Sequence, residues 1–169
     1  PSSPSSSSHP STKHSPHHVP PMSQTKCIYH VVISTKGGEM VLGEENSPKL
    51  YAYMCGILKK MDCFIHAING IPNHIHILME LPSTLALADV MRELKKNSSI
   101  WASSSGLFPM FKGWVKEYGG FSVSFSHVEH IKSYIQGQKA HHAGLNYDDE
   151  YKRLILKNGL VFYQYPSDG

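Results

Sequence analysis

The segment HIHILMEL, residues 74–81, alternates two kinds of side chain with a period of two. Successive residues of a β-strand point to opposite faces of a sheet, so His74 and His76 share one face, and Ile75, Ile77 and Met79 share the other. The aliphatic face needs a layer of helices to cover it. The sequence therefore predicts a sheet with one face packed on a core and another face on which two imidazoles could share a divalent ion.

The segments around this strand predict its neighbours. Runs rich in β-branched and aromatic residues predict strands at 27–36, 63–68 and 120–126. Apolar spacings of three and four predict helices from Ser47 to Met61 and at 84–102, 127–143 and 147–157. The expected local signals are a turn that begins at Asn69-Gly70, a capping box of Ser126 with Glu129, and a helix end at Gly144.

The order of these elements is strand, helix, strand, strand, helix, strand, followed by extra helices. This is the ferredoxin-like split βαβ order, which predicts an α+β fold with an antiparallel sheet. Two helices are expected on one face of the sheet, and a tyrosine-bearing helix on or near the other face.

The first 21 residues differ in composition from the rest of the 169-residue chain. They are mostly Ser, Pro and His without apolar periodicity, which predicts a disordered leader at 1–21 and one domain at 22–169. The leader is interpreted either as an extension added before a natural start at Met22 or as a native disordered tail. No secretory signal or membrane span is expected, and three cysteines without CxxC spacing favour a reducing, cytoplasmic location. The domain is only mildly basic, which permits a partner that bears phosphates without requiring one.

The third predicted helix places Tyr134 and Gln138 four residues apart, on one helical face beside an apolar stripe of Val128, Ile131 and Ile135. A helix packed on the open face of the sheet would bring both side chains near the histidines. Each residue also has an ordinary interpretation, as a boundary tyrosine and as a solvated glutamine. Two histidines alone are likewise compatible with hydrogen-bonded or surface side chains.

Taken together, these motifs resemble the single-tyrosine HUH transposases of short insertion sequences that move as single-stranded DNA. The resemblance extends over most of residues 26–160 and includes YHVVISTK, INGIPNHIHILMEL, RELKKNSS, GWVKEYGGFSVSFS and YIQGQKAHH. His74-Ile75-His76 matches the HUH motif, and the Tyr-x-x-x-Gln helix follows about 60 residues later. Asn73 and Gly120 depart from the pattern, where an acidic residue and an alanine are expected.

The resemblance implies that Tyr134 is the nucleophile and that His74, His76 and Gln138 bind a divalent metal, Mg²⁺ or Mn²⁺. It implies cleavage and rejoining of single-stranded DNA through a 5′-phosphotyrosine, without a nucleotide cofactor. The expected partners are strands with hairpin ends and a second copy of the chain. In that homodimer, the tyrosine helix of one subunit can complete the histidine site of the other.

Other features stay open at this stage. The sequence does not identify the base that activates the tyrosine, although His130 and His141 are candidates. Phosphate contacts could come from the lysines of the helices and loops, which are Lys59, Lys60, Lys95, Lys96, Lys112 and Lys116. The alternatives are a non-mobile protein that binds hairpin DNA and an HUH-type nicking protein. An RRM-like module is disfavoured because no RNP1 pattern is present, and a phosphoesterase because no paired His-x-Thr motifs are present.

Overall fold

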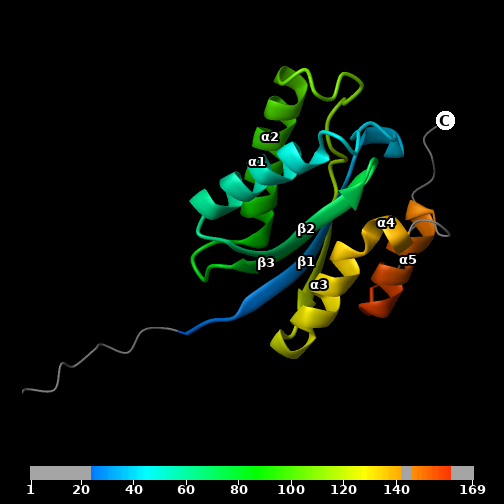
Figure 1. Ribbon diagram of the computed structural model, residues 1–169. Helices are drawn as coiled ribbons and strands as arrows, with labels where there is room; N and C mark the ends of the chain where they lie inside the picture. Colours follow the sequence, from blue (N-terminus) through cyan, green and yellow to red (C-terminus); the bar gives the residue numbers. More distant parts are fainter. Residues whose placement is uncertain (1–23, 142–145, 161–169) are drawn as a thin grey trace, which may run out of the picture.

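The computed structural model describes residues 24–141 and 146–160, and it places a four-stranded sheet between two groups of helices (Figure 1). The strands are β1 (Cys27–Ser34), β2 (Phe64–Ile71), β3 (His74–Leu81) and β4 (Gly119–Val123). The helices are α1 (Ser47–Lys60), α2 (Leu87–Ser104), α3 (Val128–Gln136), α4 (Gln138–His141) and α5 (Tyr147–Lys157), with short 3-10 helices at Lys36–Gly38 and Phe125–His127. The strand order is β2-β3-β1-β4, with all neighbours antiparallel. This confirms the ferredoxin-like α+β arrangement.

The core lies between the sheet and the layer of α1 and α2. The β3 side chains Ile75, Ile77 and Met79 are fully buried there, as the alternation of this strand predicts. Each helix contributes a buried stripe at helical spacing, and the stripe residues are Leu50, Met54 and Leu58 in α1 and Val90, Met91 and Leu94 in α2. This layer leaves the opposite face of the sheet to α3, α4 and α5 (Figure 1).

The β2-β3 hairpin differs from the predicted turn. β2 continues through Asn69 and Gly70 to Ile71, so Pro72 and Asn73 form the connection. A Cβ on Gly70 would lie only 2.2 Å from the carbonyl oxygen of His74, and the two strands therefore approach each other here as only glycine allows. The Asn-Gly signal was wrong as a turn because the strand needs glycine for this close approach.

The predicted helix at 127–143 is interrupted. α3 ends at Gln136, Gly137 follows as its C-cap, and α4 begins at Gln138. The predicted capping box is also absent within the described residues, because the N-cap of α3 is His127 and it makes no side-chain cap bond. The Ser126 hydroxyl lies instead near the ring of His127. The apolar stripe is confirmed, since Val128 and Ile135 pack on the sheet with Ile131 beside them.

Several further boundaries shift, and the strand expected at 27–36 ends at Ser34 as β1. β4 ends at Val123 instead of 126, because a 3-10 helix occupies Phe125–His127, and α2 begins at Leu87 instead of 84. Within the described part of the chain, no helix combines the length and apolar character that crossing a bilayer requires. The leader at 1–21 and Gly144 lie outside the described residues.

Candidate active site

The two histidines of β3 lie under the helices that cover the second face of the sheet. His74 and His76 are 0% and 1% exposed, and their ring centroids are 5.0 Å apart. They share a face, as predicted, and that face is closed because α3 and α5 pack over it (Figure 1). Water is therefore largely excluded from the imidazoles, which strengthens electrostatic interactions within the site.

A second group of side chains fixes the imidazole orientations. Asn73 Oδ1 lies 2.7 Å from His74 Nδ1, and Asn73 Nδ2 donates to the carbonyl of Gly38, so the amide oxygen faces the ring. Since that oxygen can only accept, His74 Nδ1 carries the proton and Nε2 keeps its lone pair. Asn73, where the family pattern suggested an acidic residue, thus still supplies the acceptor.

His30 plays the same part for His76. Its Nε2 lies 2.8 Å from His76 Nδ1, and the two rings are stacked with centroids 5.1 Å apart. Burial lowers the pKa of His30 to about 4, against the opposing effect of the Glu150 charge, so His30 is neutral near pH 7. A neutral His30 can accept a hydrogen bond from His76 Nδ1. His76 Nε2 is then the unprotonated nitrogen, and its lone pair can bind a metal ion.

The tyrosine helix ends beside this pair. Tyr134 lies in the last turns of α3, with its ring centroid 5.9 Å from that of His76. Asn69 of β2 fastens this end of the helix, because its Nδ2 donates to the carbonyls of Ile135 and Gln136 at 3.1 Å each. These carbonyls belong to the last turn, where no intrahelical donor remains.

Gln138 follows the break at Gly137 and is 0% exposed. Its Nε2 donates to Glu150 Oε1 over 3.3 Å, so it joins the group at the histidines. The structure therefore brings together all four predicted site residues within one chain. The break at Gly137 alters the route of the backbone, because Gln138 begins α4 and does not continue the helix of Tyr134.

Glu150 of α5 is the central residue that the sequence analysis missed. Its Oε2 lies 3.4 Å from His74 Nε2, and its Oε1 lies 3.6 Å from His76 Nε2 and accepts a hydrogen bond from the Tyr134 hydroxyl. It is 7% exposed. A signal was present, because Tyr147, Glu150, Tyr151 and Leu154 recur at spacings of three and four. That pattern places a carboxylate on the inward stripe of a charged helix.

This arrangement keeps the phenol of Tyr134 protonated. Burial raises its pKa well above the usual value, and the bond to Glu150 and the negative charge of Glu150 raise it further. The Gln138 side chain acts in the opposite direction. Tyr134 can therefore become a nucleophile only if its surroundings accept the proton or add positive charge.

The donor set suits a divalent cation. Single ligand atoms of His74, His76 and Glu150 all lie within 4.8 Å of one another, and both histidines present Nε2 with Nδ1 already engaged. Two imidazole nitrogens with one carboxylate bind first-row divalent metals and leave coordination positions for a substrate. The geometry therefore fits a metal that acts on a bound phosphate or carbonyl oxygen.

Other predicted contacts lie elsewhere. His130 is exposed on α3, and the side chain of His141 lies outside the described residues. Lys59, Lys60 and Lys96 are exposed on α1 and α2, across the sheet from the histidines. Lys95 is only partly buried, and its ammonium donates to the carbonyl of Lys116.

The comparisons with known proteins give the family and support the fold. The sequence profile of a family described as IS200-like transposases matches residues 23–138. A crystal structure of a candidate transposase from Deinococcus radiodurans R1 superposes with a TM-score of 0.54 at 24% identity, over 69% of this chain and 93% of that one. The structure of a REP-associated tyrosine transposase bound to a REP hairpin gives 0.55 at 14% identity, over 89% and 93%. At these identities the two structures support the fold, and the search of curated protein sequences found no match.

Proposed function

The chain belongs to the family of IS200-like transposases, and from this premise we propose that it cleaves and rejoins single-stranded DNA through a covalent tyrosine intermediate. The observation that most strongly supports the proposal is the hydrogen bond from Tyr134 to Glu150, whose carboxylate also contacts His74 and His76. A phenol, a proton acceptor and a candidate metal site thus meet at one buried point.

In the proposed reaction, the phenolic oxygen of Tyr134 attacks the phosphorus of a phosphodiester. The new bond joins tyrosine to the 5′-phosphate, and the bond to the 3′ oxygen breaks, which leaves a 3′-hydroxyl after protonation. Glu150 Oε1 is placed to accept the phenolic proton, because it already accepts the hydrogen bond from that hydroxyl. A 3′-hydroxyl of another strand then attacks the phosphotyrosine, so rejoining needs no nucleotide cofactor.

His74, His76 and Glu150 would hold a divalent metal, and Gln138 would add its amide oxygen. Mg²⁺ or Mn²⁺ is the expected ion, and when bound it polarises the phosphodiester and offsets the developing negative charge. The Nε2 atoms of both histidines face the carboxylate of Glu150. This carboxylate supplies a negative charge that the predicted ligand set of His74, His76 and Gln138 lacked. Chelation should therefore stop cleavage without unfolding the sheet.

The proposed DNA partner is a single strand that carries hairpins at the ends of a mobile element. One structural neighbour, the REP-associated tyrosine transposase, is bound to a REP hairpin, which supports this class of partner. The proposed location of this activity is the cytoplasm, which three cysteines without CxxC spacing favour.

The experiment that tests this proposal is covalent trapping. A hairpin-bearing strand labelled 3′ of the cleavage site should become attached to the protein in the presence of Mn²⁺ or Mg²⁺, and the adduct should migrate as a larger species in a denaturing gel. Tyr134→Phe should abolish the adduct and keep hairpin binding. Tyr53→Phe is the matched control, since Tyr53 is 38% exposed on α1 and a phenylalanine keeps its stacking on Trp101.

The same assay separates the alternatives. Hairpin binding without any adduct in the wild type would favour a non-mobile DNA-binding protein. Cleavage without strand transfer to a second DNA end would favour a nicking protein. An adduct that persists at the wild-type level in Tyr134→Phe would assign the nucleophile to another residue.

We also propose that the active protein is a homodimer, as the resemblance implies. The described chain assembles Tyr134 with its own histidines, whereas an exchanged α3 would place the tyrosine in the partner's site. Mixing Tyr134→Phe with His76→Ala distinguishes these arrangements. Shared sites would restore cleavage to at most about half, because one composite site then has both intact groups. A stable heterodimer without cleavage would assign each site to a single chain.

A further inference from the structure

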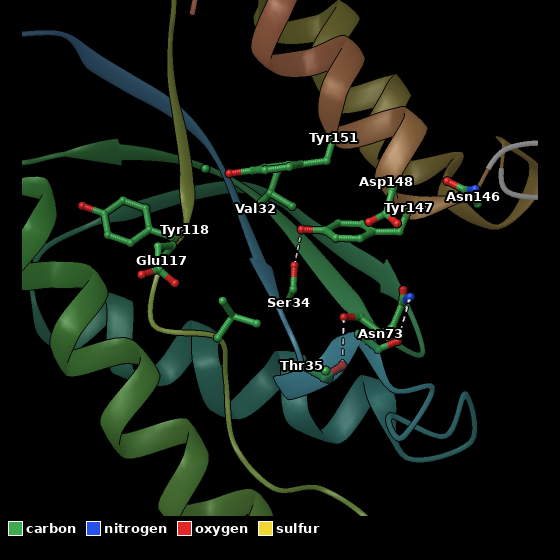
Figure 2. A pocket seen from close by; sticks show the side chains of 14 residues that line it. Val32, Ser34, Thr35, Asn73, Glu117, Tyr118, Asn146, Tyr147, Asp148 and Tyr151 are labelled. Carbon is green, nitrogen blue, oxygen red and sulfur yellow. Dashed lines mark hydrogen bonds between the residues drawn. The ribbon is translucent and has the colours of Figure 1, made fainter. Parts of the chain in front are cut away.

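A pocket opens between α5 and the segment that leads into β4 (Figure 2). Its volume is about 560 Å³, which is within the range of small-molecule sites. The floor includes Val32 and Ser34 of β1, while Glu117 and Tyr118 stand on one side and Tyr147 and Tyr151 of α5 on the other (Figure 2).

The walls are aromatic and partly fixed. The rings of Tyr147 and Tyr151 are stacked with centroids 5.6 Å apart and 19° between their planes. The hydroxyl of Ser34 bonds to that of Tyr147 and holds this ring in place. Tyr118 adds a third ring from the opposite wall (Figure 2). Flat aromatic surfaces of this kind stack favourably on flat ligands.

The pocket is joined to the proposed active site through Tyr147. The centroids of the Tyr147 and His74 rings are only 4.5 Å apart, and Asn73, which lines the pocket, also orients His74. A flat group held in this pocket would therefore lie next to the histidine site, as the base of a nucleotide adjoining a phosphate bound there would require.

The charge of the lining disfavours a phosphate as the occupant. None of the described residues that line the pocket is Lys, Arg or His, whereas Glu117 and Asp148 bring carboxylates. The first turn of α5 contains three acidic residues, which already complement the positive end of the helix dipole. The lining thus offers aromatic faces and hydrogen-bond acceptors, and suits a neutral flat ligand with N–H donors.

We infer that this pocket receives an unpaired nucleobase with an exocyclic amino group, from a nucleotide next to the phosphate that Tyr134 attacks. Adenine, cytosine and guanine present such amino groups, and carboxylates accept hydrogen bonds from them, whereas thymine has no exocyclic amino group. The placement of this nucleotide rests on the proposed function, because it assumes that a single strand crosses the histidine site.

The first test uses binding and does not depend on cleavage. Fluorescein-labelled homo-oligonucleotides of deoxyadenosine, deoxycytidine and thymidine, and an abasic strand of equal length, are titrated with the Tyr134→Phe protein and followed by anisotropy. We expect the adenine or cytosine strand to bind about three- to tenfold more tightly than the thymine strand, which is the net effect of one typical hydrogen bond. The abasic strand should bind most weakly.

Variants assign the preference to the pocket. Asp148→Asn together with Glu117→Gln should bring the adenine, cytosine and thymine strands close to equal affinity, because both carboxylate acceptors become amides. Asp149→Asn is the matched control, since it makes the same change one residue away, outside the pocket lining. Tyr118→Leu should lower the affinity for all three strands. Tyr118→Phe should bind them as the wild-type residue does, because phenylalanine keeps the ring.

The outcomes distinguish this inference from the proposed function. Equal binding of the four strands, or a base preference that survives Asp148→Asn with Glu117→Gln, would overturn the pocket assignment even if covalent trapping succeeds. A preference that these variants abolish would support the pocket even if Tyr134 forms no adduct, and in that case only the proposed cleavage would fail.

Discussion

Replacing Gly70 by alanine should destabilise the protein strongly, because the new Cβ has no space. It would lie 2.2 Å from the carbonyl oxygen of His74 and 2.9 Å from Cα of Ile75. The first distance is 0.8 Å shorter than the 3.0 Å below which real Cβ contacts essentially never occur. Both neighbours are backbone atoms of a paired strand, so neither can rotate away as the end of a side chain could.

To relieve this contact, β2 and β3 would have to move apart at a point where their backbones are paired. We expect the free energy of unfolding to fall by about 3 kcal/mol, the upper part of the range for over-packed positions. This is a large share of the ~5–15 kcal/mol that stabilises a typical domain. The displaced atom belongs to His74 itself, so covalent trapping should also decrease at temperatures where the variant is still folded.

Gly56→Ala is the matched control for this substitution. Gly56 lies exposed within α1, and a Cβ there would meet no atom within 4 Å. Alanine should therefore stabilise the protein by about 0.5–1 kcal/mol, because it restricts the unfolded chain and favours the helix. Urea unfolding followed by circular dichroism measures both variants. A Gly70→Ala protein within about 0.5 kcal/mol of the wild type would refute the argument from close approach.

Three further predictions concern buried polar groups. Ser98→Ala should lower the free energy of unfolding by about 1–3 kcal/mol, because the Trp114 indole N–H, which donates to Ser98 Oγ over 3.0 Å, loses its acceptor; chemical denaturation measures this. Glu150→Gln should weaken Mn²⁺ binding in calorimetry, whereas Asp149→Asn should leave it unchanged; equal affinities would exclude Glu150 as a ligand. The pKa of His30 is about 4 in the fold against 6.5 in the unfolded chain. As pH falls from 6.5 toward 4, the unfolded chain therefore binds a proton that the fold does not, and the free energy of unfolding decreases. In EDTA, the free energy of unfolding of the wild type should therefore fall by ~3 kcal/mol more over this interval than that of His30→Gln. Parallel plots of unfolding free energy against pH for the two proteins would contradict the assignment.

The sequence predicts those parts of the fold that depend on periodicity. The alternation in β3 separates His74 and His76 from the core side chains, and the helical spacing in α1 and α2 identifies their buried stripes. These patterns are local, because a side chain's face follows from its position in the strand or helix. The ferredoxin-like order follows from the sequence of elements for the same reason.

The parts that the sequence did not predict depend on contacts between distant segments. Glu150 meets the histidines only because α5 folds back over the sheet, and no local pattern gives the direction of that helix. His30 pairs with His76 through the antiparallel register of β1 and β3, in which Val32 stands opposite His76. Asn69 and Gly70 carried a turn signal, yet the site uses them in a strand, where tertiary contacts outweigh local preference.

The two hydrogen bonds from Asn69 to the end of α3 have a consequence for any exchange of helices between subunits. If α3 moved to a second copy, it would meet an identical Asn69 there, and both bonds could form again. The closed monomer and the exchanged pair would then have the same contacts, and their balance would depend on strain in the residues before α3 and on protein concentration. Dilution would accordingly favour the closed monomer, and crowding on a DNA strand that binds two copies would favour the exchanged pair.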